Sequence, residues 1–259
     1  MRMRSARRRG KRPLRVVDTG EAHPHLTGAI DELLLRRAGD DAGGSLHLYS
    51  REPPAVTYGY FEKAVESVDL DYCRAEGIVP MRRLSGGSAI YTDRNQLVYA
   101  IATKDGLPGS PDDVYEIVCG GIVSALKSLG ADATYKKPND VQAGGRKLSG
   151  SAMTRKYGGV LVHGTVIVEL DRERLERALR QPMKHSEKGI ARHGDRLTSL
   201  AEVLGRAPPM EKVKGALVAG FCECLEAKPF KKPLSADERR TALDLVETKY
   251  GADRWNLRR

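Results

Sequence analysis

Apolar positions along the chain recur either at helical spacing or in short continuous runs. Leu26, Ile30, Leu33 and Leu34 share one face of a helix predicted over residues 22–37. Further helices are expected over residues 69–76, 110–130, 171–180, 210–226 and 236–249. Strands are expected at 14–17, 45–50, 55–59, 78–84 and 97–102, with several more between 132 and 169. Because strands and helices mix without strict β-α-β alternation, the pattern favours a single α/β (α+β) domain with a mixed β-sheet flanked by helices.

The helix expected from residue 110 has the clearest start and end signals. Ser110 can cap its N-terminus, and Asp113 is favourable at the positive end of a helix. Gly130 is suited to end it. Ser235 and Glu238 have the spacing of a capping box at the start of the last helix. The sequence therefore predicts where both helices begin.

Positive charge is concentrated at the N-terminus. The chain has 259 residues and a formal net charge of +10, but seven of its 44 basic residues lie within residues 1–12. Without those seven, the excess over the 34 acidic residues falls to three. Runs of like charge are usually solvated and disordered, so residues 1–12 are interpreted as a disordered basic arm and residues 13–259 as the folded domain. Contact of the arm with nucleic acid or a membrane surface is the alternative.

Composition excludes several classes of protein. No apolar run approaches the roughly 18 residues of a membrane span, and no apolar segment follows the basic N-terminus as in a secretory signal. Aromatic residues make up 5% of the chain, which argues against a stacking platform for nucleic acid. The four cysteines have no zinc-site spacing. We therefore expect a cytoplasmic protein with no membrane partner.

Three segments carry candidate chemistry. Residues 82–89 read RRLSGGSA, where glycines allow close approach of a ligand and arginines can bind a phosphate or carboxylate. In residues 139–152, Lys147 can neutralise charge on a reacting group, and Asp140 can bind Mg²⁺. His163 lies in an apolar strand beside Gly164, which often marks close approach of a backbone or ligand. Taken singly, each of the first two segments is more readily interpreted as an ordinary hairpin turn, and His163 as a buried core residue.

Taken together, the three segments are more specific. The order RRLSGGSA, NDV, GRKLSGSA and HGT resembles the lipoate–protein ligase A family, within the wider biotin and lipoate protein ligase superfamily. The similarity extends to residues 56–61, 68–72 and 248–256. It covers roughly residues 14–257, so residues 13–259 are identified as a catalytic domain of this type.

The resemblance implies an α/β domain related to the catalytic cores of class II synthetases. Lipoate and ATP, with Mg²⁺, would condense to lipoyl-AMP. The lipoyl group would then pass to a lysine of a lipoyl domain, in a 2-oxoacid dehydrogenase complex or in the glycine cleavage carrier protein. Since the adenylate is a mixed anhydride, this reaction needs positioning and charge neutralisation rather than an enzyme nucleophile. Residues 181–196 would close over the adenylate.

The resemblance also implies the site residues. Lys147 matches the lysine that contacts the acyl carbonyl and the α-phosphate, so it is the expected catalytic residue. Asp140 is also the expected contact for Mg²⁺. The expected nucleotide- and acyl-binding residues are Arg83, Ser85, Gly86, Gly87, Ser88, Ala89, Ile90, Tyr91, Asn139, Asp140, Ser149, Gly150, Ser151, Ala152, His163, Gly164 and Thr165.

The chain departs from the family pattern at three points. Ser88 stands where a third glycine is usual, and Thr92 stands where a histidine usually precedes the aspartate. The C-terminal accessory domain of longer members is missing. This predicts that the chain uses a preformed adenylate more readily than it makes one, with a separate accessory protein assisting activation.

An octanoyl- or lipoyltransferase of the same superfamily is the nearest alternative. Such enzymes form a thioester on a cysteine, which in one branch lies just before the GGRK segment. Residues 135–140 contain no cysteine. A biotin ligase is disfavoured because its basic glycine–arginine motif is absent. The third alternative, a non-catalytic protein that binds a lipoyl domain or nucleic acid, does not account for Lys147. An ATP-dependent lipoate–protein ligase is therefore the expected function.

Overall fold

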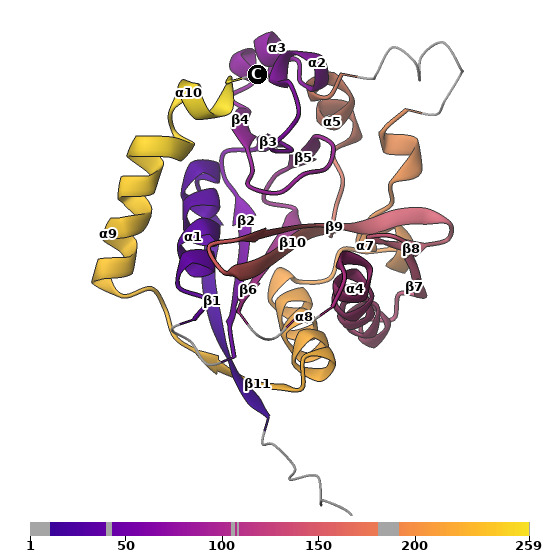
Figure 1. Ribbon diagram of the computed structural model, residues 1–259. Coiled ribbons are helices and arrows are strands. Elements are labelled where there is room, and N and C mark those ends of the chain that lie inside the picture. The colour runs from indigo at the N-terminus through magenta and orange to yellow at the C-terminus, as the bar shows by residue number, and fades with distance from the viewer. Residues whose placement is uncertain (1–10, 40–42, 105–106, 108, 181–191, 259) are drawn as a thin grey trace, which may run out of the picture.

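The computed structural model describes residues 11–39, 43–104, 107, 109–180 and 192–258 (Figure 1). Within them, an eight-stranded mixed sheet has the order β11-β1-β2-β6-β10-β9-β8-β7. Its strands are β1 (Arg12–Ala22), β2 (Ser45–Arg51), β6 (Gln96–Thr103), β7 (Ala133–Lys136), β8 (Asp140–Ala143), β9 (Arg146–Lys156), β10 (Gly159–Ile167) and β11 (Ala227–Lys231). β1 pairs in parallel with β2 and β11, and the pairs from β2 through β7 are antiparallel.

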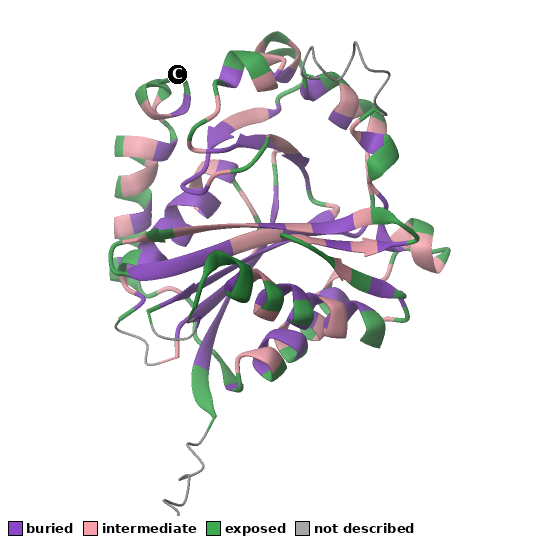
Figure 2. Ribbon diagram, turned by 45° about the vertical axis from the view of Figure 1, so that its right-hand side comes forward, coloured by how far each residue is buried: buried purple, intermediate pink, exposed green. Residues whose placement is uncertain are grey.

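Helices cover both faces of this sheet. The helices α4 (Pro111–Ser128) and α8 (Met210–Cys224) enclose the larger apolar core against one face. On the other face, α1 (Pro24–Arg36) and α9 (Ala236–Leu245) enclose a second core (Figure 1). Figure 2 shows that the strands between these layers are largely buried, whereas exposed residues lie on the outer sides of the helices. The fold is thus the predicted mixed α/β domain.

A second, smaller layer lies over one end of the large sheet (Figure 1). Its three-stranded sheet has the order β4-β3-β5, formed by β3 (Ala55–Tyr58), β4 (Val79–Arg82) and β5 (Ile90–Thr92). The helices α2 (Ala64–Ser67), α3 (Leu70–Ala75) and α5 (Arg172–Ala178) pack around this sheet. The short elements later in the chain are the 3₁₀ turn η1 (Gly194–Arg196), α7 (Leu200–Leu204), the π-helical turn η2 (Val246–Tyr250) and α10 (Asp253–Asn256). The glycine turn at residues 85–88 lies between β4 and β5, at the edge of this layer.

The structure confirms the helix starts that the sequence predicted at Ser110 and Ser235. Ser110 and Ser235 both form capping boxes, with Asp113 and Glu238 respectively. The strand expected at 14–17 extends from Arg12 to Ala22 because it is paired on both sides. β11 was not predicted, since its exposed Ala-Lys-Pro-Phe-Lys sequence has no apolar alternation. Pairing with β1 therefore decides that this segment is a strand.

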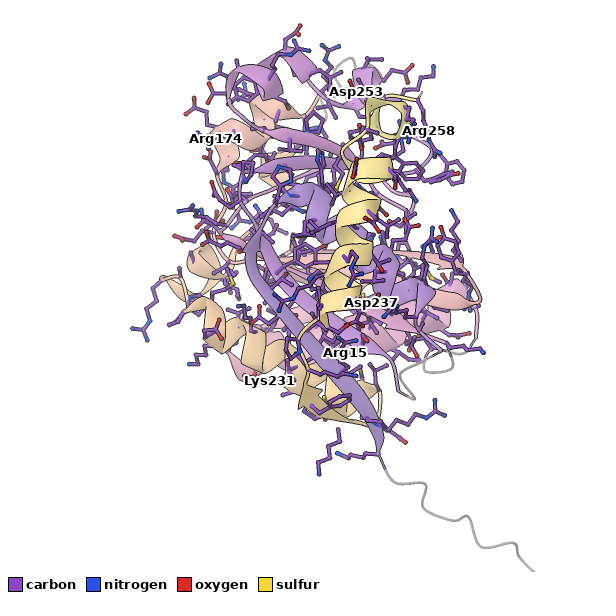
Figure 3. All side chains as sticks on the ribbon, turned by 90° about the vertical axis from the view of Figure 1, so that its left-hand side faces the viewer. Arg15, Arg174, Lys231, Asp237, Asp253 and Arg258 are labelled. Atoms are coloured by element: carbon purple, nitrogen blue, oxygen red, sulfur yellow. The ribbon has the colours of Figure 1, made fainter. Side chains whose placement is uncertain are left out.

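A buried ion pair joins the first strand to the last long helix. Arg15 of β1 donates two hydrogen bonds of 2.7 and 2.8 Å to the carboxylate of Glu238, at the start of α9. Its guanidinium also donates to the backbone carbonyls of Lys232 and Pro233. Figure 3 shows Arg15 between β1 and α9. The described residues include no helix that is both long and apolar enough to cross a membrane.

Candidate active site

Two adjoining cavities lie between the small sheet and strands β8, β9 and β10 of the large sheet. The first has a volume of about 310 Å³ and the second about 550 Å³. Their common wall consists of Ser88, Ile90, Asp140, Lys147, Gly150 and Thr165. A ligand that spans both cavities would therefore pass Lys147 at their junction.

Most of the predicted site residues line these cavities. Those on the first cavity are Arg83, Gly87, Ser88, Ile90, Asn139, Asp140, Lys147, Gly150, Ser151, Ala152, His163, Gly164 and Thr165. Ala89 and Tyr91 line the second. Ser85, Gly86 and Ser149 line neither cavity. For Ser85 and Ser149 the reason is full burial, with 0% and 1% of each residue exposed, so a direct ligand contact by these side chains is not supported.

Lys147 is held at the junction by its neighbours on β8 and β9. Its Nζ lies 2.6 Å from Oδ1 of Asp140, and about a third of each side chain is exposed. A Cβ atom at Gly150 would collide with the end of the Lys147 side chain, so a larger residue there would displace the ammonium group from its present position. The β8–β9 register shifts between Val141 and Gln142, which is a bulge of the kind that redirects side chains. The ammonium group is thus both positioned and open to a ligand.

The side-chain donors of the two arginines before the glycine turn go mainly to backbone carbonyls, and ligand binding by Arg83, which lines the first cavity, stays a prediction. Arg83 donates to the carbonyls of Thr57, Gly86 and Ser88 at 2.8–2.9 Å. Burial lowers the pKa of Arg83 to about 10. Arg82 is fully buried and donates to carbonyls that include those of Gly59 and Asn256. Because their donors are used by backbone carbonyls, these two side chains shape the turn.

A buried carboxylate organises the cavity wall behind the turn. Asp31 of α1 accepts hydrogen bonds from Nδ1 of His47 at 2.8 Å and from the hydroxyl of Tyr49 at 3.0 Å. Nδ1 of His163 lies 3.4 Å from the same carboxylate, and Nε2 of His163 lies 2.6 Å from Oγ of Ser85. Burial alone would raise the pKa of Asp31, but the imidazole hydrogen bonds outweigh it and lower the pKa to about 2. An ionised Asp31 can only accept hydrogen bonds, so the Nδ1 atoms that face it act as donors.

The second cavity has both polar and apolar side chains in its wall. Nε2 of Gln96 and Nε2 of His193 are buried and have no hydrogen-bond partner among the described residues. Both residues line this cavity, together with the cationic side chains of Arg146 and Arg196. Buried donors without partners are costly unless a ligand satisfies them. A ligand that forms hydrogen bonds with these nitrogens would offset that cost.

A metal site made by protein side chains alone is not present in the described residues. They contain no cluster of three or more His, Cys, Asp or Glu side chains that could hold an ion. The carboxylate of Asp140 is already paired with Lys147. Mg²⁺ commonly binds through few carboxylates and the phosphates of its substrate, so its expected contact with Asp140 stays a prediction.

The segment expected to close over the adenylate is only partly described. Residues 181–191 lie outside the described residues. The remainder forms η1, and Asp195 and Arg196 there line the second cavity. Leu197, which follows, forms a bridge to Lys147. This end of the segment therefore contacts the strand that carries the expected catalytic lysine.

Several cavity residues escaped the sequence analysis. Arg51 and Tyr49 of β2 line the first cavity, and Gln96 and Gln142 line the second. All seven residues of β2 are buried, although four of them are polar or charged: Ser45, His47, Ser50 and Arg51. The available signal for Tyr49 and Arg51 was their position at the end of the strand expected at 45–50.

The fold and the paired cavities define an acyl-group enzyme of the biotin and lipoate ligase type. The family model of the lipoyl protein ligase A/B catalytic domain matches residues 23–222. The chain belongs to this family.

Relatives of known name fall into two groups. Octanoyltransferase LipM of Kyrpidia tusciae is 32% identical, and the alignment covers 95% of this chain and 98% of the relative. A bi-partite lipoate protein ligase from Thermoplasma acidophilum, studied with its E2 lipoyl domain, has a TM-score of 0.84, 27% identity, and coverage of 96% and 97%. A lipoate-protein ligase A bound with ATP has a TM-score of 0.80, 26% identity, and coverage of 96% and 99%.

These names bear on the choice between ligase and transferase. The curated relatives similar in sequence are octanoyltransferases, which supports the transferase alternative better than the expected ligase. The solved structures similar in fold are ligases. The chain is thus an enzyme of the lipoyl and octanoyl transferase–ligase superfamily.

Proposed function

We propose that this chain attaches a medium-chain acyl group, of the lipoyl or octanoyl class, to a lysine of a lipoyl domain through an acyl-adenylate. The observation that carries this proposal is a pair of cavities that meet at Lys147 and contain no thiol among their described lining residues. The first cavity would hold the acyl chain and the second would hold ATP. The partner is supported by the structural relative that was studied with its E2 lipoyl domain.

Lys147 would neutralise charge in both half-reactions. In the first, an oxygen of the acyl carboxylate attacks the α-phosphorus of ATP and pyrophosphate leaves. In the second, the acceptor amine attacks the acyl carbon, AMP leaves, and the amine loses a proton. Lys147 lies at the junction of the two cavities, so its ammonium group would stabilise negative charge in each transition state. Asp140 holds that ammonium group in place at 2.6 Å.

A transferase that uses a thioester is the second candidate, and the names of the sequence relatives favour it. It requires an accessible thiolate. Burial raises the pKa of Cys119 to about 11, and that of Cys73 and of Cys224 to about 12. Burial also raises the pKa of Cys222. Cys119 is 0% exposed, with Sγ 3.8 Å from Oγ of Ser151, so the thiol nearest the site lies behind the cavity wall.

The test supplies three donors to the purified chain with a lipoyl domain and follows the mass of that domain. The donors are lipoate or octanoate with ATP, synthetic lipoyl-AMP, and octanoyl thioester on an acyl carrier protein. A mass gain with acid plus ATP, or with lipoyl-AMP, supports the adenylate route. A gain from lipoyl-AMP alone would show that activation requires an accessory protein. A gain from the thioester alone would overturn the route and establish the transferase.

A matched pair of variants tests the site. Lys147→Ala should lower acyl transfer by about 100-fold or more, as loss of a charge-stabilising donor does elsewhere. Lys127→Ala removes an exposed lysine of α4 and should leave the rate unchanged. Equal rates for both variants, with both chains folded, would refute the assignment of Lys147.

A further inference from the structure

A buried guanidinium lies in the first cavity without a carboxylate partner. Arg51, at the end of β2, lines this cavity and is 5% exposed. It also borders a small space lined by Asp31 and Leu161. Lys147, by contrast, lines the first cavity and the second. Lys147 therefore lies on the wall that the two cavities share, whereas Arg51, like Arg83, lines the first cavity away from that wall.

The side-chain hydrogen bonds of Arg51 all go to neutral hydroxyl groups. Nη1 donates to Oγ1 of Thr92 at 2.8 Å, whereas Nε lies 3.4 Å from Oγ1 of Thr27 and Nη2 lies 3.5 Å from the hydroxyl of Tyr49. Among the described residues, no carboxylate oxygen lies within 4.0 Å of this guanidinium. A guanidinium has five N–H donors, so two of them remain for a ligand.

The acidic group of this region is already engaged. The carboxylate of Asp31 accepts from His47 and Tyr49 and faces His163. A buried charge without an ion-pair partner costs several kcal/mol. An anionic group on a ligand would offset that cost and would form charge-assisted, two-pronged hydrogen bonds with the guanidinium. An apolar chain end would leave the guanidinium with its hydroxyl hydrogen bonds and the ring of Tyr49, whose centroid lies 5.5 Å from Cζ, but with no anionic partner.

We propose that the preferred acyl substrate carries a second carboxylate at its far end, and that Arg51 binds it. The inference rests on the proposed acyl transfer and changes the acyl group, from lipoyl or octanoyl to one of similar length with a terminal carboxylate. Thr92 fits this arrangement, because its hydroxyl accepts the shortest hydrogen bond of Arg51 and so orients the guanidinium. Thr92, which stands where the family usually has a histidine, thereby contributes to substrate selection.

The test compares octanedioate with octanoate, two acids of equal chain length that differ in the far carboxylate, and includes lipoate. Pyrophosphate exchange with ATP and binding by calorimetry are measured for each acid. We expect kcat/KM and affinity at least tenfold higher for octanedioate. Octanoate or lipoate used as well as octanedioate would overturn this inference and leave the proposed acyl transfer intact.

Variants at Arg51 separate charge from packing. Arg51→Met keeps the length of the side chain and should remove the preference for octanedioate, whereas Arg51→Lys should retain part of it. Arg94→Met is the control, because Arg94 is exposed and pairs with Glu52 at the surface. Thermal unfolding verifies that each variant is folded. If octanedioate binds wild type and Arg51→Met equally, or binds neither, the inference fails even where no turnover is seen.

Discussion

Replacing Asp31 by asparagine tests the buried network that supports the cavity wall. The hydrogen bonds from His163 and His47 outweigh burial and hold the pKa of Asp31 at about 2, against an ordinary value of 3.8. A difference of about 1.8 units corresponds to about 2–3 kcal/mol of stability near neutral pH. Counting hydrogen bonds gives a similar figure. Three donors face the carboxylate and the amide cannot accept them all, so one buried donor is left at a cost of about 1–3 kcal/mol.

The sign of the pH dependence follows from the lowered pKa. A carboxyl group whose pKa is lower in the folded state stabilises the fold above its unfolded pKa, and that contribution disappears as the pH falls through the folded value. The advantage of wild type over Asp31→Asn should therefore be complete near pH 7. It should shrink to about half near pH 3, between the two pKa values.

Urea unfolding at both pH values measures this difference, with Asp71→Asn as the control. Asp71 is 88% exposed and pairs with Arg74 at the surface, so its replacement should change stability by no more than about 0.5 kcal/mol. A variant Asp31→Asn as stable as wild type near pH 7 would refute the reasoning. An equal loss at both pH values would show that the ionisation of Asp31 is not what stabilises the network.

Two further changes test the packing around the site and the link between its layers. Glu238→Gln should cost about 3 kcal/mol near pH 7, because the hydrogen bonds from Arg15 lower the pKa of Glu238 to about 2. This loss of stability should diminish as the pH falls below 4.5 towards 2. An equal free energy of unfolding for the variant and wild type, measured in urea at pH 7, would contradict the prediction. Gly164→Ala should lower the melting temperature and the acyl-transfer rate, since its Cβ would collide with the hydroxyl of Tyr99 and the carbonyl of Gly150. Gly120→Ala, which meets open space on α4, should be neutral or stabilising in the same assays.

The sequence predicted the site residues that lie within short motifs better than those that tertiary contacts bring to the cavity. Lys147, Asp140 and the glycine turn were found because each lies in a short segment with a recognisable pattern. Arg51 and Asp31 were missed because β2 and α1 carry no such pattern. They reach the cavity only through the pairing of β2 with β6 and the packing of α1 on the sheet. The sequence also did not show that backbone carbonyls use side-chain donors of Arg82 and Arg83, because some of those carbonyls belong to residues more than 20 positions away.

By itself, the sequence determined the features that depend on residues a few positions apart. The caps at Ser110 and Ser235, the helical faces and the family motifs belong to this group, since hydrogen bonds within one turn decide them. The tertiary structure alone decided that β11 is a strand and that Arg51 has no carboxylate partner among the described residues. It also decided that the described cavity walls contain no thiol. These properties depend on strand order and on competition for buried hydrogen-bond donors, which bring together residues far apart in the chain.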